Sequence, residues 1–450
     1  MSEGGLSGYA GLSRQILATV GAKVGDRIRL ELRRETGQEV VEGLLIPRSW
    51  TRSDNYVVVK LKTGYNVGVR IDSGTKITVI GKGEEPHFTR PTPPPRKTGL
   101  PKVTIISTGG TIASKVDYRT GAVKSALDAE DLYSVVPELA EIAEIKARIL
   151  FSIFSENIGP QIWSKIAEAV NEEVRAGADG VVIAHGTDTM GYTAAALSFA
   201  LKGIPIPVVL VGSQRSSDRP SSDAATNLLA ATAVAGQAPF AEVVVAMHDW
   251  VSDERVAIHR GTRVRKCHTS RRDAFRSVNA APLAHFDLLH SSLKVNSEEY
   301  AKRKKVTDWA PRIQFDPNVA LIKFHPGLSV GVIDWAIATG YKGLVIEGSG
   351  LGHVADTLIP ALERAVKEGL VVGMCSQCIW GTVHMDVYST GRDLQRVGVM
   401  PLRDMLAETA LAKMMWAFGQ DKNPEKVKEI MLTDLANEIS DRRILEAVQE

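Results

Sequence analysis

The first 85 residues alternate apolar and polar positions in short stretches. Ile28, Leu30 and Leu32 are separated by charged residues, as expected for a β-strand with one buried face. Five short strands so closely spaced predict a small all-β barrel at residues 1–85, after a short helix near the start of the chain. The other apolar runs, divided by glycine and aspartate turn residues, lie at 40–46, 56–61, 65–69 and 76–80.

Prolines dominate the next stretch, residues 86–101, which reads PHFTRPTPPPRKTGLP. Proline lacks a backbone N–H and restricts φ, so neither a regular helix nor a central strand is expected there. We interpret this stretch as a stiff, extended linker between the barrel and the remainder of the chain.

Beyond residue 101 the pattern changes to continuous apolar runs that alternate with stretches of helical spacing. Such runs are typical of strands buried on both faces, and helices between them indicate parallel strand pairing. We therefore expect a large α/β lobe at residues 102–280. Its expected strands lie at 103–107, 180–184, 208–212 and 243–247, and its expected helices at 160–176, 191–202 and 223–235.

The alternation stops after Asn279 and resumes some forty residues later. We interpret residues 281–318 as an irregular connection and residues 319–420 as a second, smaller α/β lobe. Residues 421–450 are rich in charge and predict a tail that is helical almost to its last residue. The predicted fold class is α/β, with a two-lobed parallel-sheet body preceded by a small all-β barrel.

The charge is nearly balanced over the whole chain and uneven along it. The 450 residues carry a formal net charge of +2 and 24% are charged, which excludes a wholly disordered chain and disfavours nucleic-acid binding through overall charge alone. Residues 1–97 carry +6 and the remainder −4, so the front domain is compatible with either tRNA binding or partner docking. A second basic stretch, from Arg255 to Arg276, includes Arg260, Arg263, Arg265, Arg271 and Arg272.

Only three cysteines are present, which favours a reducing compartment. With no signal-peptide pattern and no apolar run of about 18 residues, we expect a cytoplasmic protein with no membrane contact. Cys375 and Cys378 have metal-like spacing, and His384 lies near them. A zinc site needs about four ligands and no second cysteine pair exists, so we expect no metal site.

Candidate chemistry lies at two expected strand ends, where ligand sites of open α/β sheets are found. One strand runs into TGGTI at 108–112 and another into HGTDTM at 185–190. Each loop places a threonine hydroxyl after glycine, at Thr111 and Thr187, and the second adds Asp188. A threonine attacks only when a base takes its proton, and the candidates are His185, Asp188 and a lysine elsewhere. No phosphate-binding glycine motif is present.

Both segments resemble the signature segments of the L-asparaginase/glutaminase family. The resemblance covers Lys102 to about Trp416. It continues in order through SEN at 155–157, VGSQR at 211–215, FRSVN at 275–279 and EGSGLG at 347–352.

The resemblance implies a role for four residues. Thr111 is the nucleophile of the first loop, Thr187 is the threonine of the second, and Asp188 holds the substrate α-ammonium group. The catalytic lysine, counted back from FRSVN, is Lys266, which in its neutral form accepts the proton of Thr187. Which threonine attacks the amide is left open.

The same resemblance implies further substrate-binding residues. Ser155 grips the α-carboxylate and Tyr118 is the tyrosine of a mobile lid, although its spacing differs by one residue. Glu156 stands where many members have Gln, and Leu351 stands where bacterial enzymes have a substrate-contacting Asn. The loop glycines expected beside the substrate are Gly110 and Gly186.

The order of barrel, proline linker, asparaginase-like body and C-terminal helix is similar to one branch of that family, the D subunits of archaeal glutamyl-tRNA(Gln) amidotransferases. The resemblance implies that this chain hydrolyses glutamine and that ammonia passes to a partner, the E subunit of the amidotransferase. It also implies a heterotetramer with a central dimer of this chain, and Glu-tRNA(Gln) contacted mostly through the partner. We expect no cofactor here, with ATP and Mg in the E subunit.

Two alternatives remain open at this point. A free-standing L-asparaginase with a fused barrel would hydrolyse asparagine rapidly without a partner. A non-catalytic RNA-binding or scaffold protein would need none of Thr111, Thr187, Asp188 and Lys266. Residues 1–101 favour the amidotransferase subunit, since a simple asparaginase does not need them.

Overall fold

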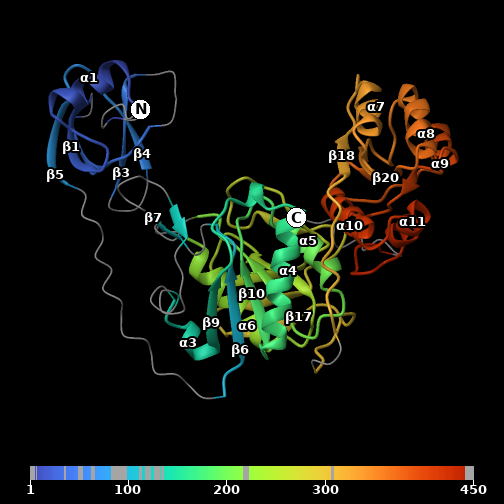
Figure 1. The fold of residues 1–450 in the computed structure, drawn as a ribbon. Helices are drawn as coiled ribbons and strands as arrows, with labels where there is room; N and C mark the ends of the chain where they lie inside the picture. The colour runs from blue at the N-terminus through green and yellow to red at the C-terminus, as the bar shows by residue number, and fades with distance from the viewer. Residues whose placement is uncertain are drawn as a thin grey trace.

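The computed structural model describes most of the chain as an N-terminal β-domain followed by a two-lobed α/β body (Figure 1). The predicted fold class is thereby confirmed. The described residues are 6, 8–34, 37–48, 54–61, 66–82, 99–110, 114–116, 123–125, 132, 136–215, 222–305 and 309–440. None of the helices in these ranges combines the length and apolar composition that a bilayer crossing requires.

The β-domain consists of one helix and a five-stranded antiparallel sheet in the order β4-β3-β2-β1-β5. Ile28, Leu30 and Leu32 are buried, as the alternation predicts, and the hydroxyl of Tyr9 donates to the Ile46 carbonyl at 2.8 Å. Most of the predicted linker lies outside the described residues. The elements are α1 (Gly11–Thr19), β1 (Asp26–Arg34), β2 (Gly37–Leu45), β3 (Tyr56–Lys60), β4 (Asn66–Arg70) and β5 (Lys76–Lys82).

The large lobe is built on an eight-stranded sheet in the order β17-β16-β13-β12-β11-β10-β6-β9. The five strands from β12 to β9 are parallel, and all of them except β9 are the predicted apolar runs. The strands are β6 (Lys102–Ser107), β9 (Glu144–Ile149), β10 (Gly180–Ala184), β11 (Val208–Val211), β12 (Val243–His248), β13 (Arg255–Arg260), β16 (Ala284–Asp287) and β17 (Ser292–Val295).

The sheet is mixed, because three strands at one end, β13, β16 and β17, pair antiparallel. The expectation that residues 281–318 are only irregular is wrong, since β16 and β17 lie there. Both strands are four residues long and alternate buried or half-buried positions with more exposed ones. Such a short, half-buried strand has no continuous apolar run by which it could be found in the sequence.

Helices cover both faces of this sheet. On one face α4 (Pro160–Arg175) and α5 (Met190–Ala200) share a core with the C-terminal helices, and on the other lie α3 (Leu139–Ile142) and α6 (Ala224–Gln237). Nearly every residue of α5 is buried, because the helix lies between the large sheet and α10 of the second lobe. A separate antiparallel pair is formed by β7 (Ser114–Val116) and β8 (Val123–Ser125).

The small lobe has a four-stranded parallel sheet with its own apolar core. Helix α10 (Ala407–Gln420) joins this lobe to the large one, since its residues belong to the core that contains α4 and α5. The remaining elements are β18 (Val319–Lys323), α7 (Gly331–Ala338), β19 (Gly343–Gly348), α8 (Ile359–Lys367), β20 (Val371–Ser376), α9 (Ser389–Arg396) and β21 (Met400–Pro401).

Within the part of the tail that the structure describes, up to residue 440, the helix is shorter than predicted. Helix α11 (Pro424–Leu432) begins at a capping side chain, because Asn423 accepts the N–H of Glu425, and it ends eight residues before the last described residue. Glu438 accepts the backbone N–H groups of Leu435 and Ala436, which holds the segment in a turn. The charged composition of the tail does not reveal that the Glu438 carboxylate binds backbone N–H groups, which favours a turn over a continued helix.

A fully buried ion pair ties that turn to the body. The ammonium group of Lys413, on α10, lies 2.5 Å from the Glu438 carboxylate, and both side chains are inaccessible to solvent. Lys413 also donates to the carbonyls of Met431 and Thr433. Because each buried charge has its counterion, the pair makes the position of the C-terminal segment specific.

We predict that Lys413→Met destabilises the protein strongly, because it leaves the Glu438 carboxylate buried without a cation. The free energy of unfolding, measured by urea denaturation followed by circular dichroism, should fall by about 3–5 kcal/mol. Adding Glu438→Gln should recover part of this loss. Lys426→Met, which breaks an exposed pair with Glu429, is the control and should leave the urea midpoint unchanged. An equal midpoint for Lys413→Met and wild type would contradict the prediction.

Candidate active site

Two loops that carry the candidate chemistry lie side by side because their strands are neighbours. Strands β6 and β10 are parallel, with Ser107 opposite Ala184 at their carboxyl ends. Thr108 then donates both its backbone N–H and its hydroxyl to the Ala184 carbonyl, each at 3.0 Å. The loops that begin at Thr108 and at His185 are thus held together at their first residues.

Glycine is required in both loops by close backbone approach. Gly110 has φ +84°, and a Cβ placed there would lie 2.7 Å from the backbone nitrogen of Gly186. A Cβ on Gly186 would in turn lie 2.8 Å from the Cβ of Ser155. These contacts are too short for any real side chain, so the three segments meet only because the loops lack Cβ atoms here.

Lys266 reaches the second loop from a distant part of the sequence. Its ammonium nitrogen lies 2.9 Å from the Thr187 hydroxyl oxygen and 2.7 Å from an Asp188 carboxylate oxygen. The lysine side chain is 13% exposed, whereas that of Asp188 is 73% exposed. A largely shielded lysine therefore contacts the candidate nucleophile, and the carboxylate beside it remains open to solvent.

The candidate bases Lys266 and His185 differ in their position relative to Thr187. The Lys266 nitrogen is within hydrogen-bonding distance of the Thr187 hydroxyl oxygen. His185 instead donates from Nδ1 to its neighbour's carbonyl, Gly186, at 2.6 Å and is completely buried. Burial lowers the pKa of His185 to about 4, so its imidazole is neutral near pH 7. We interpret His185 as a structural residue of the loop.

Ser155 and Glu156 lie on a short 3-10 turn (Ser155–Asn157) beside the second loop. Ser155 is buried, and its carbonyl accepts the hydroxyl of Thr189 at 2.6 Å. Glu156 is exposed. Thr189 was not singled out from the sequence, although its place in the HGTDTM segment was a signal. Ser155 therefore lies close to Gly186 of the second loop, and the hydrogen bond from Thr189 holds the turn against that loop.

Two predicted site residues, Thr111 and Tyr118, lie outside the described residues. The first loop is described as far as Gly110. The structure therefore brings together Thr187, Asp188 and Lys266, and their close neighbours are Gly110, Gly186 and Ser155.

A buried polar network supports a third loop, which is formed by the VGSQR segment at 211–215. Asp223 accepts the backbone N–H groups of Gln214 and Arg215, and Asn227 donates to the Gly212 carbonyl. A Cβ on Gly212 would lie 2.8 Å from the methyl group of Thr187, so this loop packs directly against the candidate nucleophile. Its supporting residues are separated in sequence, which is why no motif revealed them.

The basic stretch from Arg255 to Arg276 is not a free cationic surface. Each of its seven arginines lies within ion-pairing distance of a carboxylate. The interpretation of this run as a local basic feature is thereby corrected, because its charge is locally neutralised. The pairs are Arg255 with Asp249, Arg260 with Glu242, Arg263 with Asp404, Arg265 with Glu408, Arg271 and Arg276 with Asp273, and Arg272 with Asp253.

Cys375 and Cys378 differ in their surroundings. Cys375 is buried, which raises the pKa of its thiol, whereas Cys378 is exposed. Among the described residues there is no group of three or more histidines, cysteines or carboxylates placed to hold a metal ion.

Comparisons with family models match most of the chain. The asparaginase N-terminal model matches residues 102–300 and the glutaminase/asparaginase C-terminal domain model matches 318–431. A third model, the GatD N-terminal domain, matches 22–80, which includes much of the β-domain.

The chain is similar to solved structures over about three quarters of its length and to curated proteins over nearly all of it. L-asparaginases from Thermococcus kodakarensis and Vibrio cholerae superpose with TM-scores of 0.67 and 0.66, at 33% and 28% identity; each covers 76% of this chain, and 100% and 99% of those chains respectively. The glutamyl-tRNA(Gln) amidotransferase D subunit of Metallosphaera sedula is 49% identical over 98% of both chains. The Pyrococcus furiosus protein of that name is 48% identical over 95% of this chain and 97% of its own.

The body and its Thr–Asp–Lys site define a protein of the asparaginase/glutaminase class. The additional N-terminal domain and the near full-length matches then give the branch. The chain belongs to the family of glutamyl-tRNA(Gln) amidotransferase D subunits.

We predict that the protein loses stability as the pH falls from about 6.5 toward 4, because two buried histidines resist protonation. Burial lowers the pKa of His185 to about 4 and that of His259 to about 3. The stability that the two neutral histidines contribute is fully present above their unfolded-state pKa. It is lost as the pH falls toward their folded-state pKa values. The loss should reach about 1.4 kcal/mol per pH unit for each histidine.

Urea denaturation at a series of pH values between 7 and 5 measures this slope. The variant His259→Gln removes one of the two buried imidazoles, so its slope should be smaller by about one proton. Identical slopes in the variant and the wild type would refute the assignment of His259 as a buried neutral group.

Proposed function

We propose that the chain is the glutamine-hydrolysing subunit of a glutamyl-tRNA(Gln) amidotransferase and generates ammonia for a partner subunit. The observation that carries the proposal is the contact of Lys266 with both Thr187 and Asp188 in an asparaginase-like body. The match of relatives of that name over nearly the whole chain supports the same conclusion. The activity is that of an amidohydrolase acting on a carboxamide.

The proposed chemistry begins with proton transfer. Neutral Lys266 accepts the proton of the Thr187 hydroxyl, and a threonine oxygen attacks the carboxamide carbon of glutamine. The tetrahedral intermediate collapses as the amide nitrogen takes a proton and leaves as ammonia. Water then hydrolyses the ester to glutamate and restores the threonine. Thr111 remains the alternative nucleophile of the proposal.

Two side chains, one exposed and one buried, hold the α-ammonium and α-carboxylate groups of the substrate. Asp188 is largely exposed, so its carboxylate is available for the α-ammonium group while its other contact orients Lys266. Buried Ser155 is the partner of the α-carboxylate. Glu156, on the same turn, is exposed and adds a negative charge next to Ser155 in the chain.

The remaining components of the proposal lie outside this chain. Ammonia passes to the E subunit, which uses ATP and Mg to activate Glu-tRNA(Gln) and makes most of the tRNA contact. Two copies of this chain form the centre of a heterotetramer in the cytoplasm of an archaeon. The N-terminal β-domain serves either partner docking or tRNA binding, and no cofactor is needed for hydrolysis here.

A second candidate is a free-standing L-asparaginase with a fused β-domain. It is favoured by one observation, the 33% identity to an L-asparaginase whose whole length matches this chain. The first proposal accounts for more of the chain, because it also explains the domain matched at residues 22–80.

We predict weak glutaminase activity of the chain alone, rising when the E subunit and Glu-tRNA(Gln) are added. Ammonia release from glutamine and from asparagine, each with and without these partners, measures it. Rapid asparagine turnover by the isolated chain would instead support the free-standing asparaginase. No ammonia from either amide under any condition would contradict both.

We also predict that Thr187→Ala and Lys266→Ala each lower kcat by about 10³-fold or more, because each removes one end of the proton transfer. Asp188→Asn should also raise KM, since the substrate ammonium loses its counter-charge. Lys367→Ala, at an exposed ion pair of α8, is the control and should retain wild-type rates. Retained activity in Thr187→Ala and Lys266→Ala would overturn the site assignment.

A further inference from the structure

The strand that carries Lys266 is not part of either large sheet. It is β14 (Val264–Lys266), which pairs only with β15 (Phe275–Ser277) in a two-stranded sheet of three residues each, among the described strands. A hairpin of this size is marginally stable by itself. The place of the Lys266 ammonium group beside Thr187 therefore depends on what holds this hairpin from outside.

Arg263, the residue before β14, makes the most completely buried of these outside contacts. Its side chain is 2% exposed, and Nη1 donates to the Asp404 carboxylate at 2.8 Å. Nε donates to the Asn437 carbonyl and Nη2 to the Ser440 hydroxyl, each at 2.7 Å. One guanidinium group thus joins the base of the hairpin to the small lobe and to the C-terminal segment. The planar fork of arginine suits these three directions, and lysine cannot reproduce them.

Asp404 holds both strands of the hairpin at the same point. Its carboxylate accepts Arg263 and also the backbone N–H of Ser440, at 3.0 Å. Its carbonyl accepts the side-chain amide of Asn279, which lies two residues beyond β15. Asn279 also exchanges two hydrogen bonds with Gly381 of the small lobe. The open end of the hairpin is therefore anchored on each side.

We use the name arginine junction for the set Arg263, Asn279, Arg403, Asp404, Asn437 and Ser440. Three of its members adopt left-handed backbone conformations, Asn279 with φ 55°, Arg403 with φ 58° and Asn437 with φ 60°. Only one other non-glycine residue in the described part of the chain does so, Ser291. Such conformations persist where the surroundings over-determine them, and they concentrate at sites whose geometry matters.

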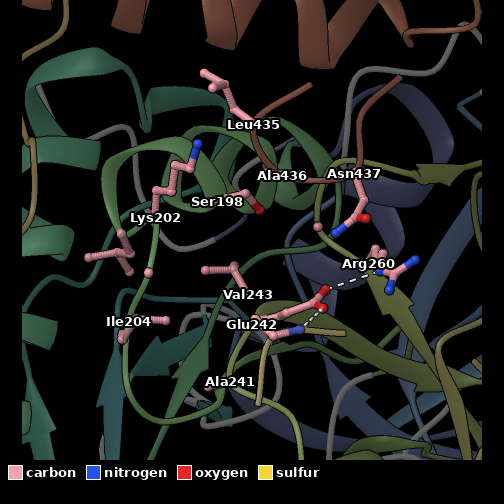
Figure 2. A pocket seen from close by; sticks show the side chains of 14 residues that line it. Ser198, Lys202, Ile204, Ala241, Glu242, Val243, Arg260, Leu435, Ala436 and Asn437 are labelled. Carbon is pink, nitrogen blue, oxygen red and sulfur yellow. Dashed lines mark hydrogen bonds and ion pairs between the residues drawn. The ribbon is translucent and has the colours of Figure 1, made fainter. Parts of the chain in front are cut away.

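The C-terminal segment packs Ile439 into the apolar core and is also hydrogen-bonded to the base of the hairpin. Figure 2 shows Leu435, Ala436 and Asn437 above a pocket that Lys202 and Arg260 also line. The Thr262 hydroxyl donates to the Ala436 carbonyl at 2.9 Å, directly beside the Arg263 contacts. Removal of the arginine fork therefore takes away the contacts that Asn437 and Ser440 make with the residue next to β14.

We infer that Arg263, held by Asp404 and by residues 437–440, is a positioning residue for Lys266, so that the C-terminal segment controls the rate of amide hydrolysis. The inference rests on the proposed function, in which Lys266 takes the Thr187 proton. Lys266 is the last residue of the three-residue strand that directly follows Arg263, and a displacement of about 1 Å in a catalytic group can cost about 10²-fold in rate. Substrate affinity comes from Asp188 and Ser155, which lie on other segments.

The test compares Arg263→Lys with Arg260→Lys in the full chain, assayed with its partner and tRNA if these are needed for turnover. Arg260 is a matched control, because it lies three residues earlier and its guanidinium group binds Glu242 (Figure 2) and the Glu299 carbonyl instead of Asp404 and Ser440. We expect Arg263→Lys to lower kcat by about 10- to 100-fold with KM for glutamine changed less than about twofold. Its kcat–pH profile should also shift, because the environment of the proton acceptor changes. Arg260→Lys should alter none of these.

Ser440→Ala is the milder variant, which removes one acceptor of Arg263 and should lower kcat by about threefold at constant KM. If Arg263→Lys does not fold, this variant decides the question. An unchanged kcat and pH profile in both variants would overturn the inference, as would equal losses in Arg263→Lys and Arg260→Lys. A wild-type chain that releases no ammonia from glutamine under any condition would reject the proposed function instead.

Discussion

The hydrogen bond between the Lys266 ammonium group and the Thr187 hydroxyl is the interaction on which the candidate active site depends. Its two residues are 79 positions apart, and they lie on separate elements. Thr187 follows a strand buried in the centre of the large sheet, whereas Lys266 lies on a hairpin of six paired residues. The strand before Thr187 is held on both sides by neighbouring strands of the sheet. The hairpin of Lys266 is held mainly by side-chain contacts with other segments.

Those attachments explain why the active-site region is rich in arginine. The tip of the hairpin is held by Arg272, which pairs with Asp253. Its middle is held on one strand by Arg276, which donates to the Asp249 carbonyl, and on the other by Arg265 through Glu408 on α10. Arg263 completes the series at the base. The lysine is thus placed by contacts with the large lobe, the small lobe and the C-terminal segment together.

Prediction from the sequence succeeded where a local pattern had one structural meaning. The continuous apolar runs indicated the central parallel strands, and the alternation of Ile28, Leu30 and Leu32 indicated a strand of the β-domain. It failed where the partner was distant. Nothing in the basic stretch indicates that Arg263 meets Asp404 141 residues later, or that Glu438 folds the tail into a turn around Lys413. The antiparallel strands β16 and β17 were missed because each is short and half exposed.

The paired arginines also bear on how this chain meets a polyanion. Association with nucleic acid gains free energy when a cationic side chain displaces counterions from phosphates. Seven arginines that already contact carboxylates have little of this gain to offer, because a phosphate would first have to displace an internal anion. The surface around the Lys266 hairpin is consequently poor in electrostatic attraction despite its composition. The exposed Asp188 carboxylate beside this hairpin adds negative charge, which suits the ammonium group of a small zwitterion such as glutamine better than a phosphate.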